Sequence, residues 1–204
     1  MKKLKGFCLI LAVVSLTSLA APTITMLDDP TPSYSMQVVE NGFAGYSSGS
    51  VLSTFCVESE EQFNLGGSYY AVLSDKTSPG GSGGGSDSLD ARSAFLGTKY
   101  LSGDAGYQDQ DALQKAIWFI EDESGGVNNS YVAAATHAVN NNEWSGLGNM
   151  RIANLYASYS NGVYSGFAQD QMVAVSAVPV PGAIVLGSLG TLIVGLLRRR
   201  IMLN

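Results

Sequence analysis

The chain has 204 residues, of which 46% are hydrophobic and 14% are charged, so it can form one packed domain with short appendages. Its formal net charge is −6, but residues 21–178 hold all seventeen acidic residues and only five of the basic ones. This acidic middle argues against nucleic-acid binding, and one histidine with two cysteines excludes most metal sites and the usual catalytic triad. We therefore expect neither a metal nor another cofactor.

Residues 1–20 have the pattern of a secretory signal peptide. Three lysines near the start precede an apolar run, and the small residues Ser18 and Ala20 suit a cleavage site before Ala21. The alternative is a first transmembrane helix, but the apolar run of roughly 10–12 residues is too short to cross a bilayer. The sequence therefore predicts export of the chain.

Strand patterns fill the first half of the mature chain. Residues 21–33 are rich in proline, threonine and aspartate and are interpreted as an N-terminal extension. β-Branched and aromatic residues between glycine or asparagine predict strands at 34–40, 51–58 and 68–74. The Gly/Ser-rich residues 78–87 are expected to form a flexible linker.

The pattern becomes helical after the linker and returns to strands near the end of the ectodomain. Polar caps and apolar residues at helical spacing predict the helices, and alternating apolar residues predict the strands. The order of strands, helices and strands predicts an α+β fold, an antiparallel β scaffold with a helical insertion, over residues 34–177. The expected elements are helices at 88–101 (capped by Ser88), from Asp109 to the glycines at 125 and 126, and at 130–140, then strands at 152–159, 162–168 and 171–177.

An apolar segment close to the C-terminus has the features of a membrane anchor. Residues 182–197 carry no charge and are followed directly by Arg198, Arg199 and Arg200. We predict a transmembrane helix there, slightly shorter than the roughly 20 residues of a permanent span. The arginines place the C-terminus in the cytoplasm by the positive-inside rule, and the ectodomain then lies outside.

A proline-containing segment stands before this helix, and a simple anchor does not need it. Val178, Pro179, Pro181 and Gly182 belong to the sequence Val-Pro-Val-Pro-Gly, which the prolines hold in an extended shape that a protease cleft can bind. The segment, the helix and the arginines together resemble the PEP-CTERM sorting tails, although many members have Pro-Glu-Pro here. The resemblance implies a membrane transpeptidase of the exosortase type that removes the tail, in a Gram-negative-like bacterium.

Cys56 is the only cysteine left after removal of the signal peptide, and an unpaired thiol is unusual in an exported protein. It can be a buried small hydrophobe, half of an intermolecular disulfide, a catalytic nucleophile, or half of another covalent bond. A nucleophilic cysteine needs a nearby base, and His137 is the only histidine. A Cys–His hydrolase is therefore a weak alternative.

Gln114 offers a partner for the fourth option. It borders the apolar stripe of the helix that begins near Asp109, and Trp118 follows it by one turn on the same edge. If a strand brings Cys56 against this edge, the sulfur can attack the Gln114 carboxamide carbon, ammonia leaves, and a thioester remains. Phe55 and Trp118 are expected to shield such a bond from water.

At these two places the sequence resembles the thioester domains of bacterial surface adhesins. The matching residues are Phe55-Cys56-Val57-Glu58 and Leu113-Gln114-Lys115-Ala116-Ile117-Trp118, an aromatic-Cys-aliphatic-acid strand and an aliphatic-Gln-x-Ala-aliphatic-Trp helix. The resemblance implies that Cys56 and Gln114 form the thioester. The simpler interpretation is that the apolar residues of both motifs are core, with Gln114 solvated, since a buried free cysteine is common.

Asp104, Asp109 and Asp111 form an acidic cluster before the same helix. Their spacing lacks the calcium-binding EF-hand pattern and its final glutamate, so helix capping is the plainer interpretation.

The predicted function is that of an exported cell-surface or extracellular-matrix protein, anchored in the inner membrane before processing and acting as a single-use covalent adhesion module. It is not expected to be a turnover enzyme. Its expected partners are the export machinery, the transpeptidase and an amine-bearing surface or matrix ligand. The alternative is a non-reactive structural or carbohydrate-contacting surface protein with the same sorting tail.

Overall fold

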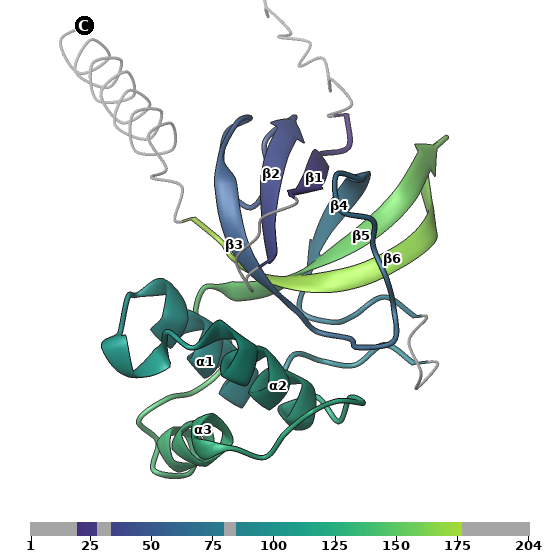
Figure 1. The fold of residues 1–204 in the computed structure, drawn as a ribbon. Coiled ribbons are helices and arrows are strands. Elements are labelled where there is room, and N and C mark those ends of the chain that lie inside the picture. Colours follow the sequence, from purple (N-terminus) through teal and green to yellow (C-terminus); the bar gives the residue numbers. More distant parts are fainter. Residues whose placement is uncertain (1–19, 28–33, 80–84, 177–204) are drawn as a thin grey trace, which may run out of the picture.

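The computed structural model describes residues 20–27, 34–79 and 85–176, which form a β-barrel above a layer of helices (Figure 1). The predicted signal peptide, the sorting segment from Val178 onward and the predicted transmembrane helix lie outside these residues, as does the middle of the Gly/Ser-rich linker. Within the described ranges no helix is both long enough and apolar enough to cross a membrane.

The barrel consists of six antiparallel strands in the described part of the chain. They are arranged in the closed order β1-β2-β3-β6-β5-β4, in which β1 pairs with β4, β3 with β6 and β4 with β5 although these strands are not consecutive along the chain. Closure of the barrel leaves no long open sheet edge at its centre. The strands are β1 (Thr23–Leu27), β2 (Tyr34–Glu40), β3 (Val51–Cys56), β4 (Ser68–Ser74), β5 (Met150–Ser160) and β6 (Val163–Ala174).

Strand β1 corrects one expectation from the sequence. Residues 21–33 are not simply an extension, because Thr23–Leu27 pairs with β2 on one side and with β4 on the other. Its alternate residues Ile24 and Met26 are fully buried in the barrel interior. The strand therefore belongs to the folded domain and is needed to close the barrel.

Among the described residues between β4 and β5 there are three α-helices, as the order of the sequence patterns predicts. They are α1 (Ala91–Leu101), α2 (Gln110–Ile120) and α3 (Ser130–Asn140), with a short 3-10 turn, η1 (Ala105–Tyr107), before α2. Side-chain oxygens of Asp90, Asp109 and Asn129 accept hydrogen bonds from the first free backbone N–H groups of the three helices. The cap of α1 is thus Asp90 and not the predicted Ser88.

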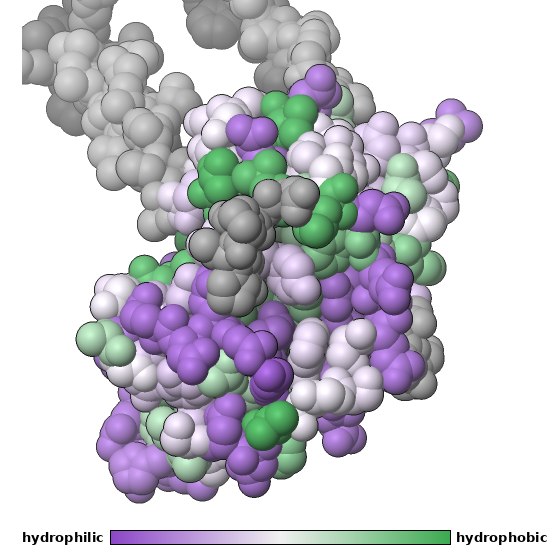
Figure 2. Space-filling model, in the orientation of Figure 1, coloured by the Kyte–Doolittle hydropathy of each residue, from purple (hydrophilic) through white to green (hydrophobic). Residues whose placement is uncertain are grey.

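The helical layer packs against one end of the barrel. Phe55 from β3, Leu113 and Ile117 from α2, and Ile152 from β5 belong to one buried apolar cluster. Helix α1 approaches closely at Gly97, where an added Cβ atom would lie 2.8 Å from the Met172 side chain. Hydrophilic residues gather over the helical layer, whereas the more apolar residues of this face lie over the barrel (Figure 2).

Strands β5 and β6 form a long hairpin that extends beyond β4 (Figure 1). Its turn is Asn161–Gly162, in which both residues have positive φ angles of 51° and 81°, as a two-residue hairpin turn of the favoured hand requires. The sequence predicts two strands, at 162–168 and 171–177, where the single strand β6 lies, with Gln169 and Asp170 between them. Gln171 is the polar residue that begins the second predicted strand. These three polar residues are nevertheless buried.

Candidate functional site

Cys56 ends β3 at the point where the barrel meets the helices. It is paired with Gln171 of β6, and only 1% of its surface is exposed. The next residue continues the contact between the two strands, because the Val57 N–H donates to the Asp170 carbonyl oxygen at 3.0 Å. The thiol is therefore held on a rigid part of the barrel and is shielded from solvent.

Gln114 reaches Cys56 from helix α2. The neighbouring residues Leu113 and Ile117 are fully buried and fix the helix against the barrel, which leaves Gln114 at the edge of the apolar stripe. The Cys56 N–H donates to Gln114 Oε1 at 2.8 Å, and Gln114 Nε2 donates to the Cys56 carbonyl oxygen at 2.7 Å. The structure thus brings together the two residues that the sequence motifs single out, with both polar ends of the carboxamide bonded to the cysteine backbone.

The sulfur itself contacts a residue that the sequence analysis missed. Gln171 Nε2 donates to Cys56 Sγ at 3.5 Å, and the thiol lies 3.8 Å from Gln171 Oε1 as a weak donor. The Thr54 hydroxyl also donates to Gln171 Oε1, at 3.0 Å. The only signal in the sequence was a polar residue within an otherwise apolar strand, and the partner of such a residue cannot be read from one strand alone.

The environment keeps the Cys56 thiol protonated at neutral pH. Burial raises the pKa of this thiol to about 12, and the hydrogen bond from Gln171 opposes that rise only in part. The buried sulfur is therefore not a free thiolate. Any attack by this sulfur must transfer its proton in the same process.

The two predicted shielding residues differ in exposure. Phe55 is buried and makes an edge-on contact with Tyr100, with ring centroids 5.1 Å apart. Trp118 is half-buried, and its indole N–H is buried without a hydrogen-bond partner among the described residues. Trp118 lies one helical turn beyond Gln114 and forms one wall of a groove of about 300 Å³. The other lining residues are Tyr34, Ser59, Glu61, Gln62, Phe63, Leu65 and Gln169.

Glu61 lines this groove, and the buried Glu58 lies three residues before it in the chain. Burial raises the pKa of Glu58 to about 9, and the negative charges of Asp170 and Glu61 add to the rise. Burial also raises the pKa of Glu61. Within the described part of the chain, the Oε2 atoms of both residues are buried without a hydrogen-bond partner. This end of the groove therefore favours protonated carboxyl groups, or a ligand that can donate to them.

The histidine and the three aspartates that the sequence analysis considered make their contacts away from Cys56. His137 is exposed on α3, where its Nδ1 atom lies 3.9 Å from Glu143, and it is not a hydrogen-bond partner of the buried thiol. Asp104 caps η1 and Asp109 caps α2, while Asp111 pairs with Lys115 at 2.6 Å. Across residues 20–27, 34–79 and 85–176, no three histidine, cysteine or carboxylate side chains are grouped as metal ligands would be.

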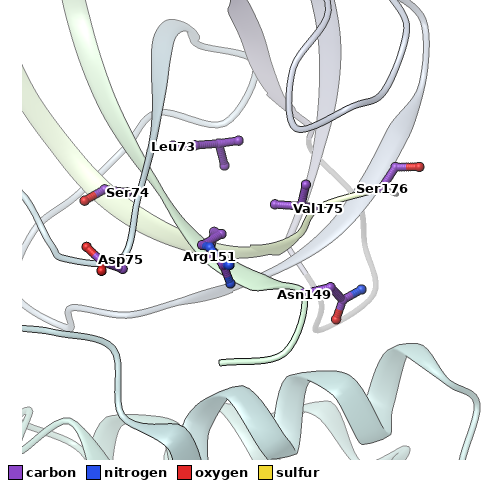
Figure 3. Close-up of a pocket in the computed structure, with 7 residues that line it drawn as sticks. All are labelled: Leu73, Ser74, Asp75, Asn149, Arg151, Val175 and Ser176. Carbon is purple, nitrogen blue, oxygen red and sulfur yellow. The ribbon is translucent and has the colours of Figure 1, made fainter. Parts of the chain in front are cut away.

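A larger cavity of about 620 Å³ lies elsewhere, against the ends of β4, β5 and β6 (Figure 3). It contains the charged residues Asp75 and Arg151, and none of the residues predicted for the thioester lines it. The Arg151 guanidinium is already bonded to the carbonyl oxygens of Gly148 and Met150. This cavity therefore does not form part of the Cys56 site.

The hydrogen bonds of Gln114 should contribute measurably to stability. In a Cys56→Ala background, where no thioester can form, Gln114→Ala is expected to lower the free energy of unfolding by about 2–4 kcal/mol, because a buried N–H and a buried carbonyl lose their partner. Urea denaturation measures this loss. Lys115 is the next residue and forms an exposed ion pair with Asp111, so Lys115→Ala should lower the free energy of unfolding by less than about 0.5 kcal/mol. Equal losses for the two variants would contradict the assigned role of the Gln114 carboxamide.

The geometry therefore consists of a buried thiol, two carboxamides in contact with its residue, and a groove one helical turn away. Comparison of the chain with protein-family models, with curated proteins and with solved structures finds no match.

Proposed function

We propose that this chain is an exported surface or matrix protein whose ectodomain forms an internal thioester between Cys56 and Gln114. The observation that carries the proposal is the pair of hydrogen bonds that fix the Gln114 carboxamide on the backbone of Cys56. Such a contact holds the reacting residues together without loss of entropy at the moment of reaction.

Formation of the bond needs no external reagent. Cys56 Sγ adds to the Gln114 carboxamide carbon, and the Cys56 N–H that already donates to Oε1 stabilises the negative charge that develops on this oxygen. Collapse of the adduct breaks the carbon–nitrogen bond. The thiol proton leaves with the nitrogen, so the products are one thioester and one ammonia.

Gln114 is a better acyl donor than Gln171, although Gln171 is the residue that contacts the sulfur. Gln171 is fully buried between strands, whereas Gln114 is 8% exposed and lies one helical turn before Trp118, which lines the groove. An acyl group must be reachable from outside if it is to react with a second molecule. Gln171 acts instead as a positioning residue, since its Nε2 donates to the sulfur and favours the charged form in which sulfur attacks.

The stored bond would react with a primary amine on another molecule. The amine nitrogen attacks the Gln114 acyl carbon, its proton passes to the departing Cys56 sulfur, and a stable amide links the two molecules. The groove lined by Trp118 lies one helical turn from Gln114, and its half-buried acid Glu61 can accept the proton that a protonated amine must lose before its nitrogen attacks. Because the bond is used once, the protein is a covalent linker and not a turnover enzyme.

The ends of the chain support the cellular part of this proposal. The signal-peptide pattern of residues 1–20 directs export, and the apolar residues 182–197 hold the protein in the inner membrane. The segment from Val178 to Gly182 serves as the recognition site for an exosortase-type transpeptidase. Processing then leaves the ectodomain at the cell surface or in the extracellular matrix.

Intact-mass measurement of the full chain, purified in detergent, tests the thioester. The expected mass is lower than that of the unreacted chain by one ammonia, after allowance for signal removal. Incubation with methylamine should add one methylamine and free one thiol. Cys56→Ala and Gln114→Ala should each abolish the ammonia loss.

The variant Gln171→Ala tests whether Gln171 only positions the sulfur while Gln114 is the acyl donor. We expect the ammonia loss to persist in this variant but to develop more slowly, because only the donor to the sulfur is removed. A full, unreacted mass in freshly prepared folded wild-type protein would refute the thioester. Loss of ammonia that depends on Gln171 and not on Gln114 would instead assign the acyl donor to β6.

A further inference from the structure

A row of aromatic side chains lies on the long hairpin of β5 and β6, away from the Cys56 site. The ring centroids of Tyr159 and Tyr164 are 4.6 Å apart, those of Tyr156 and Tyr164 are 5.0 Å apart, and those of Tyr156 and Phe167 are 5.5 Å apart. Tyr70 of β4 extends the row, at 5.8 Å from Tyr159. We call these five residues the aromatic row.

The outer part of this hairpin has no sheet partner among the described strands. Strand β4 pairs with β5 only as far as Tyr156, and β3 pairs with β6 only at Met172 and Gln171. The tip of the hairpin therefore projects from the barrel as a two-stranded ribbon (Figure 1). Such a ribbon has no core beneath it, and the stacked rings hold its two strands together.

The aromatic row is accessible as well as stacked. Phe167 is 51% exposed, and the four tyrosines are each half-buried. Neighbouring Val163 is 64% exposed. If these rings served only to stabilise the fold, we would expect them to be buried. The ribbon therefore exposes more aromatic surface than its own stability requires.

The chemistry of the ribbon is unusual for this chain. Residues 156–167 read Tyr-Ala-Ser-Tyr-Ser-Asn-Gly-Val-Tyr-Ser-Gly-Phe and contain no charged residue. The chain as a whole carries seventeen acidic residues and a net charge of −6. Tyrosine, serine, glycine and asparagine are the residues that binding surfaces use when they combine rigid aromatic contact area with neutral hydrogen-bonding groups.

We propose that the aromatic row is a binding surface for a neutral polysaccharide chain. Sugar rings have apolar C–H faces that pack on aromatic rings, and their hydroxyl groups hydrogen-bond to tyrosine and serine hydroxyls. Successive ring contacts along a strand pair suit an extended polymer of repeating units. The absence of charge on the ribbon lets a neutral ligand bind without leaving a charged group unpaired.

The charge of the chain also favours a neutral polysaccharide over two other classes of ligand, anionic polysaccharides and proteins. An anionic polysaccharide is opposed by the net negative charge of the chain, which the ribbon does nothing to offset. A typical protein partner presents charged groups at about a quarter of its residues, and the ribbon has no charged group to pair with them. A neutral glycan is not repelled by the negative charge of the chain, and it has no charged groups that need a partner on the ribbon. The proposal does not depend on the thioester, because Cys56 and Gln114 lie at the opposite end of the barrel strands from the hairpin turn.

Affinity electrophoresis of the full chain in detergent tests this inference, with gels that contain hydroxyethyl cellulose as the neutral polymer and alginate as the anionic one. We expect retardation by the neutral polymer and none by alginate. Phe167→Leu and Tyr164→Leu keep apolar bulk but remove a ring, and each should weaken binding roughly three- to tenfold.

Phe119→Leu is the matched control, because Phe119 is a similarly exposed phenylalanine, at 41%, on helix α2 and outside the aromatic row. It should bind as the wild type does, and so should Cys56→Ala. Thermal unfolding of each variant establishes that the comparison is made on folded protein. Absence of retardation by the neutral polymer, stronger retardation by alginate, or equal weakening by Phe119→Leu would each overturn the proposal.

Discussion

Replacement of Asp170 by alanine is expected to destabilise the fold by about 3–5 kcal/mol at pH 5. Asp170 is fully buried on β6, and its carboxyl oxygens accept hydrogen bonds from the backbone N–H of Leu155, the Asn154 side chain, and both the N–H and the hydroxyl of Ser78. Alanine would leave these donors buried without an acceptor. The carboxyl group thus joins β5, β6 and the segment that leaves β4.

The loss should shrink as the pH rises. Burial outweighs the four donors and raises the pKa of Asp170 to about 7, from an unfolded value near 3.8. A carboxyl whose folded-state pKa is raised stabilises the fold at low pH and loses that contribution as the pH rises toward the folded value. The difference between wild type and Asp170→Ala is therefore larger at pH 5 than at pH 8.

Urea denaturation at both pH values measures the effect, with Asp75→Ala as the control. Asp75 is an exposed aspartate near the end of β4, and its replacement should change stability by less than about 0.5 kcal/mol. Asp170→Asn keeps one acceptor oxygen and should fall between wild type and Asp170→Ala. A loss for Asp170→Ala no greater than that for Asp75→Ala would show that the hydrogen bonds to Asp170 do not support the fold.

Glu58→Gln is expected to stabilise the protein at alkaline pH, with a melting temperature about 5–10 °C above that of the wild type at pH 9. Burial, followed by the charges of Asp170 and Glu61, raises the pKa of Glu58 from 4.5 to about 9. Between these two values the folded state holds a proton that the unfolded state has lost, so wild-type stability falls as the pH rises. Glutamine has a similar shape and no charge to bury.

The prediction is best measured in the Cys56→Ala background, because alkaline pH would also hydrolyse a thioester. The melting temperatures of Cys56→Ala with and without Glu58→Gln should coincide near pH 4 and differ progressively more up to pH 9. Glu60→Gln changes an exposed neighbour and should not produce this pattern. A constant difference between Glu58→Gln and its parent at all pH values would mean that ionisation of Glu58 is not the cause.

Local patterns in the sequence were sufficient for much of the fold. The helices at 91–101, 110–120 and 130–140 have apolar residues at helical spacing and begin after side chains that cap them. The strand at 68–74 is bounded by glycine and serine, and the structure has it over the same residues. These elements are set by spacing and caps, which act over a few residues and can be read from one segment at a time.

The features that were missed depend on contacts between distant segments. Strand β1 is five residues long, and it is recognisable as a strand only because β2 and β4 flank it. Asp170 looks like a break between two strands, and Gln171 like the polar start of the second, until their partners Ser78, Asn154 and Cys56 are known. Sequence periodicity carries no information about such partners.

The roles of the acidic residues after helix α2 also depend on contacts with distant segments of the chain. Glu121 and Glu123 stand where negative charge is unfavourable to the helix dipole, and the sequence offers no role for them. In the structure, Glu121 accepts from the backbone N–H of Asp90 at 3.2 Å, and Glu123 accepts from the N–H and hydroxyl of Ser59 at 3.0 and 3.1 Å. They connect α2 to the start of α1 and to the loop after β3. A local disadvantage is thus offset by tertiary contacts.

The position of the β5–β6 hairpin has a mechanical consequence. If the protein is tethered on its C-terminal side, tension applied at the ribbon reaches the tether along the backbone of β6 itself, from Gly162 to Ser176. Tension applied at Gln114 must first pass through the rest of α2 and through α3 before it reaches β5. The ribbon would transmit force stiffly, whereas the helical layer would unravel, lengthen the chain and dissipate work before the barrel is strained.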